Sequence, residues 1–191
     1  VREPVDATTI DLQAIPNPLN SSFIDVYVTA RRALEGSPIV LRSFAGVDTT
    51  VTMALIEDDL AGRGVLIWAG NMQLAADAAG TIFYTARALT ALGTNIEDTT
   101  SIALATANAG KAVALRHQGA NLNLAADAVA AGTRLLLQRR NEAGSVAAKA
   151  AGNELELVST VAAYPAGHRL AVPGTLRLDE PHAAGEGVYR L

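Results

Sequence analysis

The sequence predicts an all-β protein made of two tandem antiparallel β-sandwiches. Short runs of alternating apolar and polar residues recur along the chain, and turn-forming residues separate them about every 8 to 15 residues. Half of the 191 residues are hydrophobic but only 4% are aromatic, so small aliphatic side chains must fill the core. No stretch has the long helical periodicity of a sustained amphipathic helix. We therefore expect many short strands and no long helix.

The clearest strand is expected at residues 22–30. Its alternation has a period of two, which is typical of a half-buried strand. We expect one face to be buried and to carry Ile24, Val26, Val28 and Ala30, while Phe23, Asp25, Tyr27 and Thr29 take the other face.

The same reasoning predicts the remaining strands of the first half. "TTVTMALIEDDLAGRG" (49–64) continues the alternation, with Val51, Met53 and Leu55 on the inner face and a turn at its end. Three other runs are short and apolar, and we expect strands at "IVLRSF" (39–44), "VLIWAG" (65–70) and "GTIFYTARAL" (80–89).

The second half repeats this pattern in shorter runs. Its expected strands are "SIALAT", "KAVALR", "ANLNLA", "TRLLLQ", "NELELV", "HRLAV" and "GTLRLD". Two alanine-rich segments, "LAADAAG" (74–80) and "LAADAVAAG" (124–132), echo each other, and single helical turns are the alternative there. We interpret both as a strand end, a bulging loop and a new strand. "EAGSVAAKAAG" (142–152) is either a short helix or a loop.

Three parts of the chain are expected from this organisation. Residues 1–15 form an N-terminal arm, 16–108 a first sandwich and 109–191 a second sandwich. The boundary falls near "TANAGK" (106–111), because that segment is small and polar and a set of strands lies on either side.

Charge and composition exclude several classes of protein. The formal net charge of −4 argues against nucleic-acid binding, which needs a basic surface. No apolar run approaches the roughly 18 residues that a membrane span requires. The absence of cysteine removes disulfides and thiol chemistry. Because the chain starts at "VREPVDATT" without methionine, we expect a processed or excised product and an extracellular or cell-surface location.

The opening of the first sandwich resembles a known class of module. "AIPNPLNSSFIDVYVTA" is similar to the start of immunoglobulin-like or fibronectin-like sandwich modules of bacterial secreted and surface proteins, where a Pro-Asn-Pro turn leads into the first long strand. The resemblance covers residues 15 to 106. It implies an Ig-like sandwich that acts as a scaffold or binding surface.

The second sandwich resembles the ZU-type β-sandwich of netrin receptors and ankyrins. "GKAVALRHQGANLNLAADAVAAGTRLLL" (110–137) has the family's glycine-led strand, small-residue loop and strand entered through Gly-Thr. "YPAGHRLAVPGTLRLDEP" (164–181) has its proline–glycine turn and final alternating strand. Ala125 and Ala126 stand where the family usually has a proline. The resemblance implies a scaffold and brings no catalytic residue.

No catalytic, cofactor or metal site is expected from the residues. His117, His168 and His182 do not lie at metal-binding spacing from one another. The acidic trio "EDD" (57–59) lacks the interleaved spacing of a calcium loop, so a solvated turn is the better interpretation. The paired glycines in "GRG" and "GEG" do not link a strand to a helix as a phosphate loop would.

Two surface features could serve recognition. Asn20 begins the sequon "NSS" in an expected turn, where a glycan acceptor should lie. Trp68 and Tyr27 could contribute to a sugar-stacking surface, although a lone tryptophan on a sandwich strand more often packs in the core.

The N-terminal arm is the expected interface. It alternates Ile10, Leu12 and Ala14 with polar residues, which is the pattern of a strand. Such a strand can complete its own sheet or add to the sheet of a neighbouring copy. We therefore expect a non-enzymatic extracellular structural protein, a homo-oligomer or polymer that forms a filament or surface layer through strand edges. The alternative is a stalk or ligand-binding fragment of a larger cell-surface or secreted protein.

Overall fold

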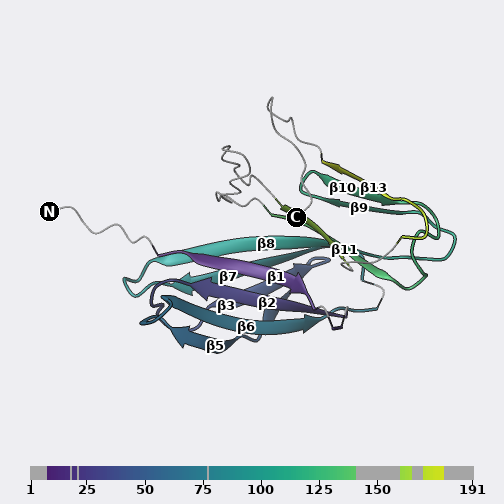
Figure 1. Ribbon diagram of the computed structural model, residues 1–191. Helices are drawn as coiled ribbons and strands as arrows, with labels where there is room; N and C mark the ends of the chain where they lie inside the picture. The colour runs from purple at the N-terminus through teal and green to yellow at the C-terminus, as the bar shows by residue number, and fades with distance from the viewer. Residues whose placement is uncertain are drawn as a thin grey trace, which may run out of the picture. The chain divides into compact units, whose positions relative to one another are not determined.

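Only β strands and their connections occur in the part of the chain that the computed structural model describes, residues 8–17, 19–20, 22–76, 78–140, 160–164 and 170–178. The strand pairings within each unit are antiparallel (Figure 1), and together with the absence of helix from the described residues they confirm the all-β prediction. Contacts divide the chain into two compact units, one ending at Thr106 and one beginning at Ala107. The expected segments 142–152 and 153–158, together with His168 and His182, lie outside the described residues.

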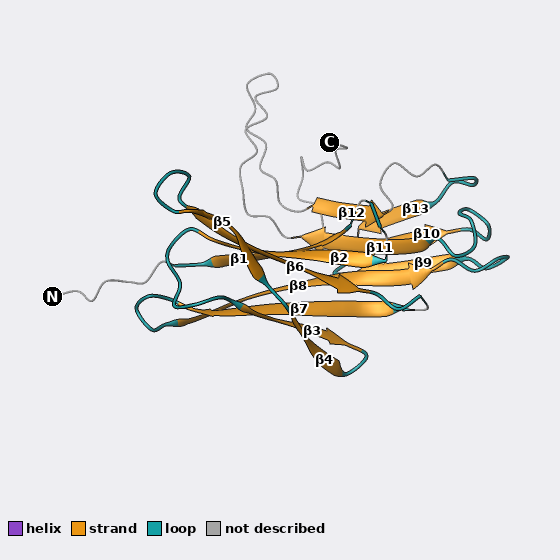
Figure 2. Ribbon diagram, turned by 90° about the horizontal axis from the view of Figure 1, so that it is seen from below, coloured by secondary structure: helices purple, strands orange, loops and turns teal. Residues whose placement is uncertain are grey.

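The first unit contains two antiparallel layers. One is a four-stranded sheet in the order β1-β2-β6-β5, and the other runs β8-β7-β3-β4 (Figure 2). The strands of this unit are β1 (Ile10–Pro16), β2 (Phe23–Ala30), β3 (Ile39–Phe44), β4 (Val47–Val51), β5 (Ala54–Asp59), β6 (Val65–Gln73), β7 (Gly80–Leu89) and β8 (Asn95–Thr106).

The core of the first unit lies between the facing sides of the two layers. On β2 the predicted inner face is confirmed, because Ile24, Val26, Val28 and Ala30 are all fully buried. Small aliphatic side chains dominate, as the low aromatic content requires. The opposite layer buries Val40, Val51, Ile82, Tyr84, Ala86, Ile102 and Leu104.

The segment 49–64, expected to be one strand followed by a turn, instead contributes to two strands in different layers. β4 ends at Val51 beside β3, and β5 begins at Ala54 beside β6, so the chain changes layer at Thr52 and Met53. The predicted inner face is therefore wrong at Leu55, which is 48% exposed, although Val51 is buried. Gly70 on β6 permits the crossing, because a Cβ there would collide with the carbonyl oxygen of Thr52 and come within 2.8 Å of the Met53 sulfur.

Two hairpins use the same tight turn. Ala45 and Gly46 join β3 to β4 with φ values of 51° and 77°, both in the left-handed region. Gln118 and Gly119 repeat the arrangement in the second unit with φ values of 45° and 79°. Positive φ at both central residues matches the right-handed twist of paired strands, which is why hairpins favour such turns.

The second unit contains a three-stranded sheet in the order β13-β10-β9 and the pair β11-β12. Its core includes Leu115, Leu124 and Leu135 to Leu137, and it also buries His117. The strands are β9 (Val113–His117), β10 (Ala120–Leu124), β11 (Arg134–Arg140), β12 (Thr160–Tyr164) and β13 (Thr175–Leu178).

The described residues of the two alanine-rich segments form loops between strands, as predicted, and none of them is helical. They share one turn, since the backbone N–H of Ala78 donates to the carbonyl of Ala75 at 3.2 Å, and Ala128 donates to Ala125 at the same distance. Ala78 and Ala128 are both buried. The repeated Leu-Ala-Ala-Asp-Ala sequence therefore marks a loop that turns one small side chain into the core in each unit.

Candidate interface at the strand edges

β1 carries the residues predicted as the interface. It pairs with β2 of its own chain over its full length, from Ile10 opposite Ala30 to Pro16 opposite Ile24. Ile10, Leu12 and Ala14 are buried, with exposed fractions of 8%, 3% and 0%. The expected arm is thus the edge strand of the first unit, and its apolar row fills that unit's own core. Exchange of this strand between copies stays a prediction.

The free edge of β1 faces β8 of the other layer. The backbone N–H of Leu12 donates to Oδ2 of Asp98 at 2.7 Å in a partly buried setting, and β1 lies along β8 (Figure 1). An edge N–H group that would otherwise need a strand partner is therefore satisfied by a carboxylate. Asp98 was not singled out from the sequence, because it lies 86 residues away from Leu12.

The turn between β1 and β2 is organised by Asn17. Its Oδ1 accepts hydrogen bonds from the backbone N–H groups of Leu19 and Asn20, both at 2.9 Å. Its Nδ2 donates to Asp25 at 2.9 Å, which ties the turn to β2. Asn20 is exposed, and its Oδ1 accepts from the backbone of Ser22 at 3.0 Å. Asn20 thus lies at the surface, as an acceptor residue requires.

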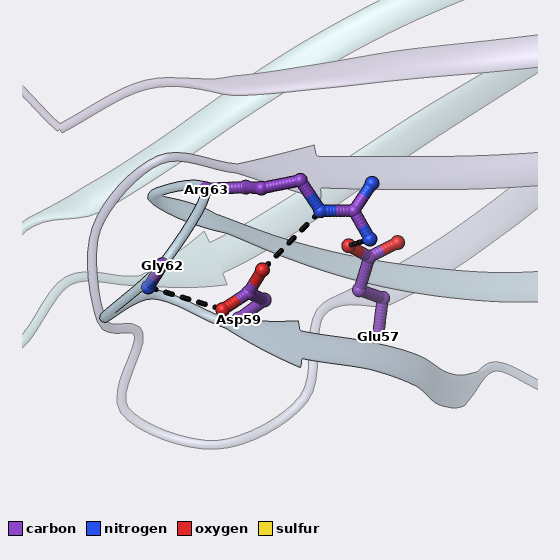
Figure 3. A network of polar contacts seen from close by, with 4 residues as sticks. All are labelled: Glu57, Asp59, Gly62 and Arg63. Atoms are coloured by element: carbon purple, nitrogen blue, oxygen red, sulfur yellow. Dashed lines mark hydrogen bonds and ion pairs between the residues drawn. The ribbon is translucent and has the colours of Figure 1, made fainter.

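The β5 edge is irregular and charged. The register shifts between Leu55 and Glu57, so Ile56 bulges out and is 60% exposed. Beyond the bulge, Arg63 forms ion pairs with Glu57 and with Asp59, the latter at 3.2 Å (Figure 3). Bulges and charges are common devices that discourage strand addition at an edge. This edge is therefore poorly suited to pair with another strand.

The acidic turn after β5 is held by hydrogen bonds. Asp59 accepts from the backbone N–H of Gly62 at 3.0 Å as well as from Arg63 (Figure 3). The pKa of Asp59 lies below its ordinary value. The main cause is a hydrogen bond from the backbone of Arg63, and the second is a hydrogen bond from the Arg63 side chain. Asp59 is consequently a stable negative charge at neutral pH. The trio at 57–59 was predicted to be a solvated turn. In the structure it is the end of β5, and Glu57 and Asp59 form ion pairs with Arg63.

The β4 edge lacks such protection. β4 lies at the end of its layer (Figure 2), and β3 is its neighbour. Val47 is 61% exposed, and Asp48 and Thr50 are exposed as well. The strand is regular, without a register shift in its pairing with β3. Among the described strands, none pairs with its open side.

Two polar atoms are buried in the core of the first unit. The hydroxyl of Tyr84 and the Nε of Arg42 have no hydrogen-bond partner among the described residues. Arg42 and Tyr84 are directly opposite each other on β3 and β7. Burial raises the pKa of Tyr84 well above its ordinary value, while the nearby Arg42 charge opposes the shift. The phenol is thus neutral at physiological pH.

The aromatic pair considered for sugar stacking is separated by the sheet. Trp68 is opposite Val28 on the inner face and is 4% exposed, whereas Tyr27 lies on the outer face.

His117 is 4% exposed, and its Nδ1 accepts a hydrogen bond from the backbone N–H of Arg139 at 2.9 Å. The described ranges contain no group of three or more His, Cys, Asp and Glu side chains that could hold a metal.

The chain matches no family model, no curated protein and no solved structure. Over the described ranges, it has no helix with the length and apolar character needed to cross a membrane.

Proposed function

We propose that the first unit is an immunoglobulin-like module. Its layers, β1-β2-β6-β5 and β8-β7-β3-β4, correspond in chain order to strands A-B-E-D and G-F-C-C′ of that fold. This agreement supports the resemblance of the sequence around the Pro-Asn-Pro turn. For the second unit, the proposal of a ZU-like sandwich rests on the sequence resemblance of residues 110–137 and 164–181.

We propose further that the chain is a non-enzymatic extracellular structural protein that assembles with copies of itself. β1 carries this proposal, because it is an edge strand with a complete row of buried apolar side chains. An edge strand can leave its sheet and take the same place in a neighbouring copy, where its strand pairing and apolar packing are remade. Repetition of that exchange from copy to copy would give a filament or a layer.

The contacts that would hold an exchanged β1 strand in place already exist in the single chain. Burying Ile10 and Leu12 contributes about 1.5 to 3 kcal/mol each. Each backbone hydrogen bond adds about 0.5 to 1.5 kcal/mol. Since these terms are equal in the closed and exchanged forms, the balance depends on the turn at 17–22. That turn would have to open, with loss of the hydrogen bonds that Asn17 makes.

The first test is the size of the full chain over a range of concentrations, by sedimentation velocity. We expect concentration-dependent assembly of the full chain and none after deletion of residues 1–15. Since β1 also fills the core, the truncated chain should regain stability when a synthetic peptide of residues 5–16 is added. A peptide with Leu12→Asp is the matched control and should not bind, because it would bury an unpaired carboxylate.

Two results would count against the proposal. A full chain that stays monomeric at all accessible concentrations would exclude assembly. A truncated chain that still assembles would show that the link lies elsewhere.

The second candidate is a stalk or ligand-binding fragment of a larger surface protein. The observation that favours it is the bond from Leu12 to Asp98, because it closes the β1 edge within one chain. A monomeric full chain whose stability does not respond to the added β1 peptide would support this candidate.

A further inference from the structure

We propose that the open edge of β4 pairs with β4 of a second copy of this chain, antiparallel and centred on Thr49. This edge is distinct from β1. The inference rests on the proposed self-assembly, because it adds a second contact between copies. It is tested by experiments other than those that test β1. The sequence of the strand, Val47-Asp48-Thr49-Thr50-Val51, reads nearly the same in both directions around Thr49.

The backbone of β4 sets which groups face the open edge. The turn at Ala45 and Gly46 is closed by the opposed residues Phe44 and Val47, whose backbone groups bond to each other. Because bonded and non-bonded pairs alternate along an antiparallel ladder, Val47, Thr49 and Val51 bond to β3. The N–H and C=O groups of Asp48 and Thr50 therefore point away from β3, toward the open edge.

A two-fold axis at Thr49 would give all of these outward-facing backbone groups a hydrogen-bond partner in the second copy. Asp48 of each copy then lies opposite Thr50 of the other, and both are residues whose backbone groups face outward. Such a pair exchanges two backbone hydrogen bonds in an antiparallel ladder. The axis generates the pair twice, so the contact is isologous and closes at two copies.

The side chains are compatible with this register. Val47 meets Val51 on the inner face, which partly covers a valine that is 61% exposed in the single chain. Asp48 meets a neutral threonine, and the two Asp48 side chains lie only on the diagonal, about 7 to 8 Å apart. A shift of the axis to Asp48 would place the two carboxylates directly opposite each other, which is unfavourable. A shift to Thr50 would pair Asp48 with Thr52, which lies beyond the end of β4.

The other edges of the first unit make β4 the best acceptor. At β5 the ladder is broken by the bulge at Ile56 and flanked by Glu57 and Asp59. At β1 the N–H of Leu12 is already bonded to Asp98. β4 has neither device, and the only charge along the strand is Asp48.

Cysteine cross-linking in the full chain tests the register. The protein has no cysteine, so each variant carries a single thiol. In the proposed pair, Thr49 faces Thr49 of the other copy as a non-hydrogen-bonded pair, with Cα atoms about 4.5 Å apart, inside the range for a disulfide. We expect Thr49→Cys to give a disulfide-linked dimer under mild oxidation roughly tenfold or more faster than Thr50→Cys, whose thiols would lie on the diagonal.

Charge variants at the exposed Thr50 give an independent readout. Thr50→Lys places a cation opposite Asp48 twice and should tighten the dimer, whereas Thr50→Asp places like charges together and should weaken it. Each change is expected to be roughly 2- to 30-fold in the dissociation constant, measured by sedimentation equilibrium at low salt. Thermal melts of both variants check that the monomer fold is unchanged.

The outcomes separate the two contacts. Fast linkage of Thr49→Cys together with opposite effects of lysine and aspartate at position 50 would support the β4 pair. Equal linkage rates at the two positions, or equal effects of the two charges, would overturn it. If the chain assembles through β1 but β4 fails both tests, the proposed function stands and only this inference falls.

Discussion

At the scale of single residues, the turn at Ala45 and Gly46 shows a mismatch between side chain and backbone. Ala45 has a φ of 51°, a region where an L residue with a Cβ costs roughly 1 to 2 kcal/mol. Gly46 meets the same requirement without that cost. The hairpin of β3 and β4 therefore forms although one of its two turn residues disfavours it, because strand pairing on either side outweighs the local strain.

Replacing Ala45 with asparagine should stabilise the protein. Asn-Gly is the preferred pair for this turn, because asparagine tolerates positive φ. We expect Ala45→Asn to raise the free energy of unfolding by about 0.5 to 1 kcal/mol in urea denaturation. The matched control, Gly46→Ala, should lower it by about 1 to 2 kcal/mol. If both substitutions act in the same direction, the turn does not have positive φ at both residues.

Tyr84 allows a second prediction at this scale. Its hydroxyl is buried and has no partner among the described residues, so removing it should cost little. We expect Tyr84→Phe to change the free energy of unfolding by less than about 0.5 kcal/mol or to raise it. Tyr84→Ala, which leaves a cavity, should lower it by about 3 to 5 kcal/mol. A loss of more than about 1 kcal/mol in the phenylalanine variant would mean that the hydroxyl is hydrogen-bonded after all, for example to an enclosed water.

At the scale of elements, alternation predicts a strand's faces well but not where the chain changes sheet. β2 was predicted correctly because one strand holds the whole pattern. The pattern of Val51, Met53 and Leu55 runs unbroken through the crossing between β4 and β5, so no local signal marks it. Gly70 on β6 leaves room for Thr52 and Met53 to pass, but this contact joins residues that are distant in sequence, so local spacing does not reveal it.

The facing of β2 can be checked directly. Val26 is fully buried, and we expect Val26→Asp to destabilise the first unit by several kcal/mol, because the carboxylate would be desolvated without a partner. Thr29→Asp, on the outer face of the same strand, is the control and should change stability by much less. A circular-dichroism melt of both variants makes the comparison. Equal melting temperatures would contradict the assigned faces.

The candidate interface shows the same limit. The alternation of Ile10, Leu12 and Ala14 predicts a strand with one apolar face, and the structure buries that face. The alternation does not predict which sheet receives the strand, because β2 of the same chain and β2 of another copy would offer identical contacts. Asp98, which caps the edge, could not be paired with Leu12 from local spacing.

At the scale of the whole molecule, aliphatic side chains form most of the core of the described residues. The chain has no cysteine, and its described residues contain no cluster suited to a metal. We therefore expect that a chelator such as EDTA changes the melting temperature of the full chain by no more than a degree or two. A calorimetric scan with and without chelator measures this. A drop of more than a few degrees would reveal a metal site that the proposed structural role does not include.

The bond between Leu12 and Asp98 also has a consequence for synthesis on the ribosome. β1 is translated early, but the carboxylate that caps its edge follows 86 residues later. At roughly 5 to 20 residues per second, the nascent β1 edge waits on the order of ten seconds for that cap. On a polysome, neighbouring nascent chains share this interval at high local concentration. If β1 exchanges between copies as proposed, translation speed as well as equilibrium stability should then affect whether it pairs with its own chain or with a neighbour.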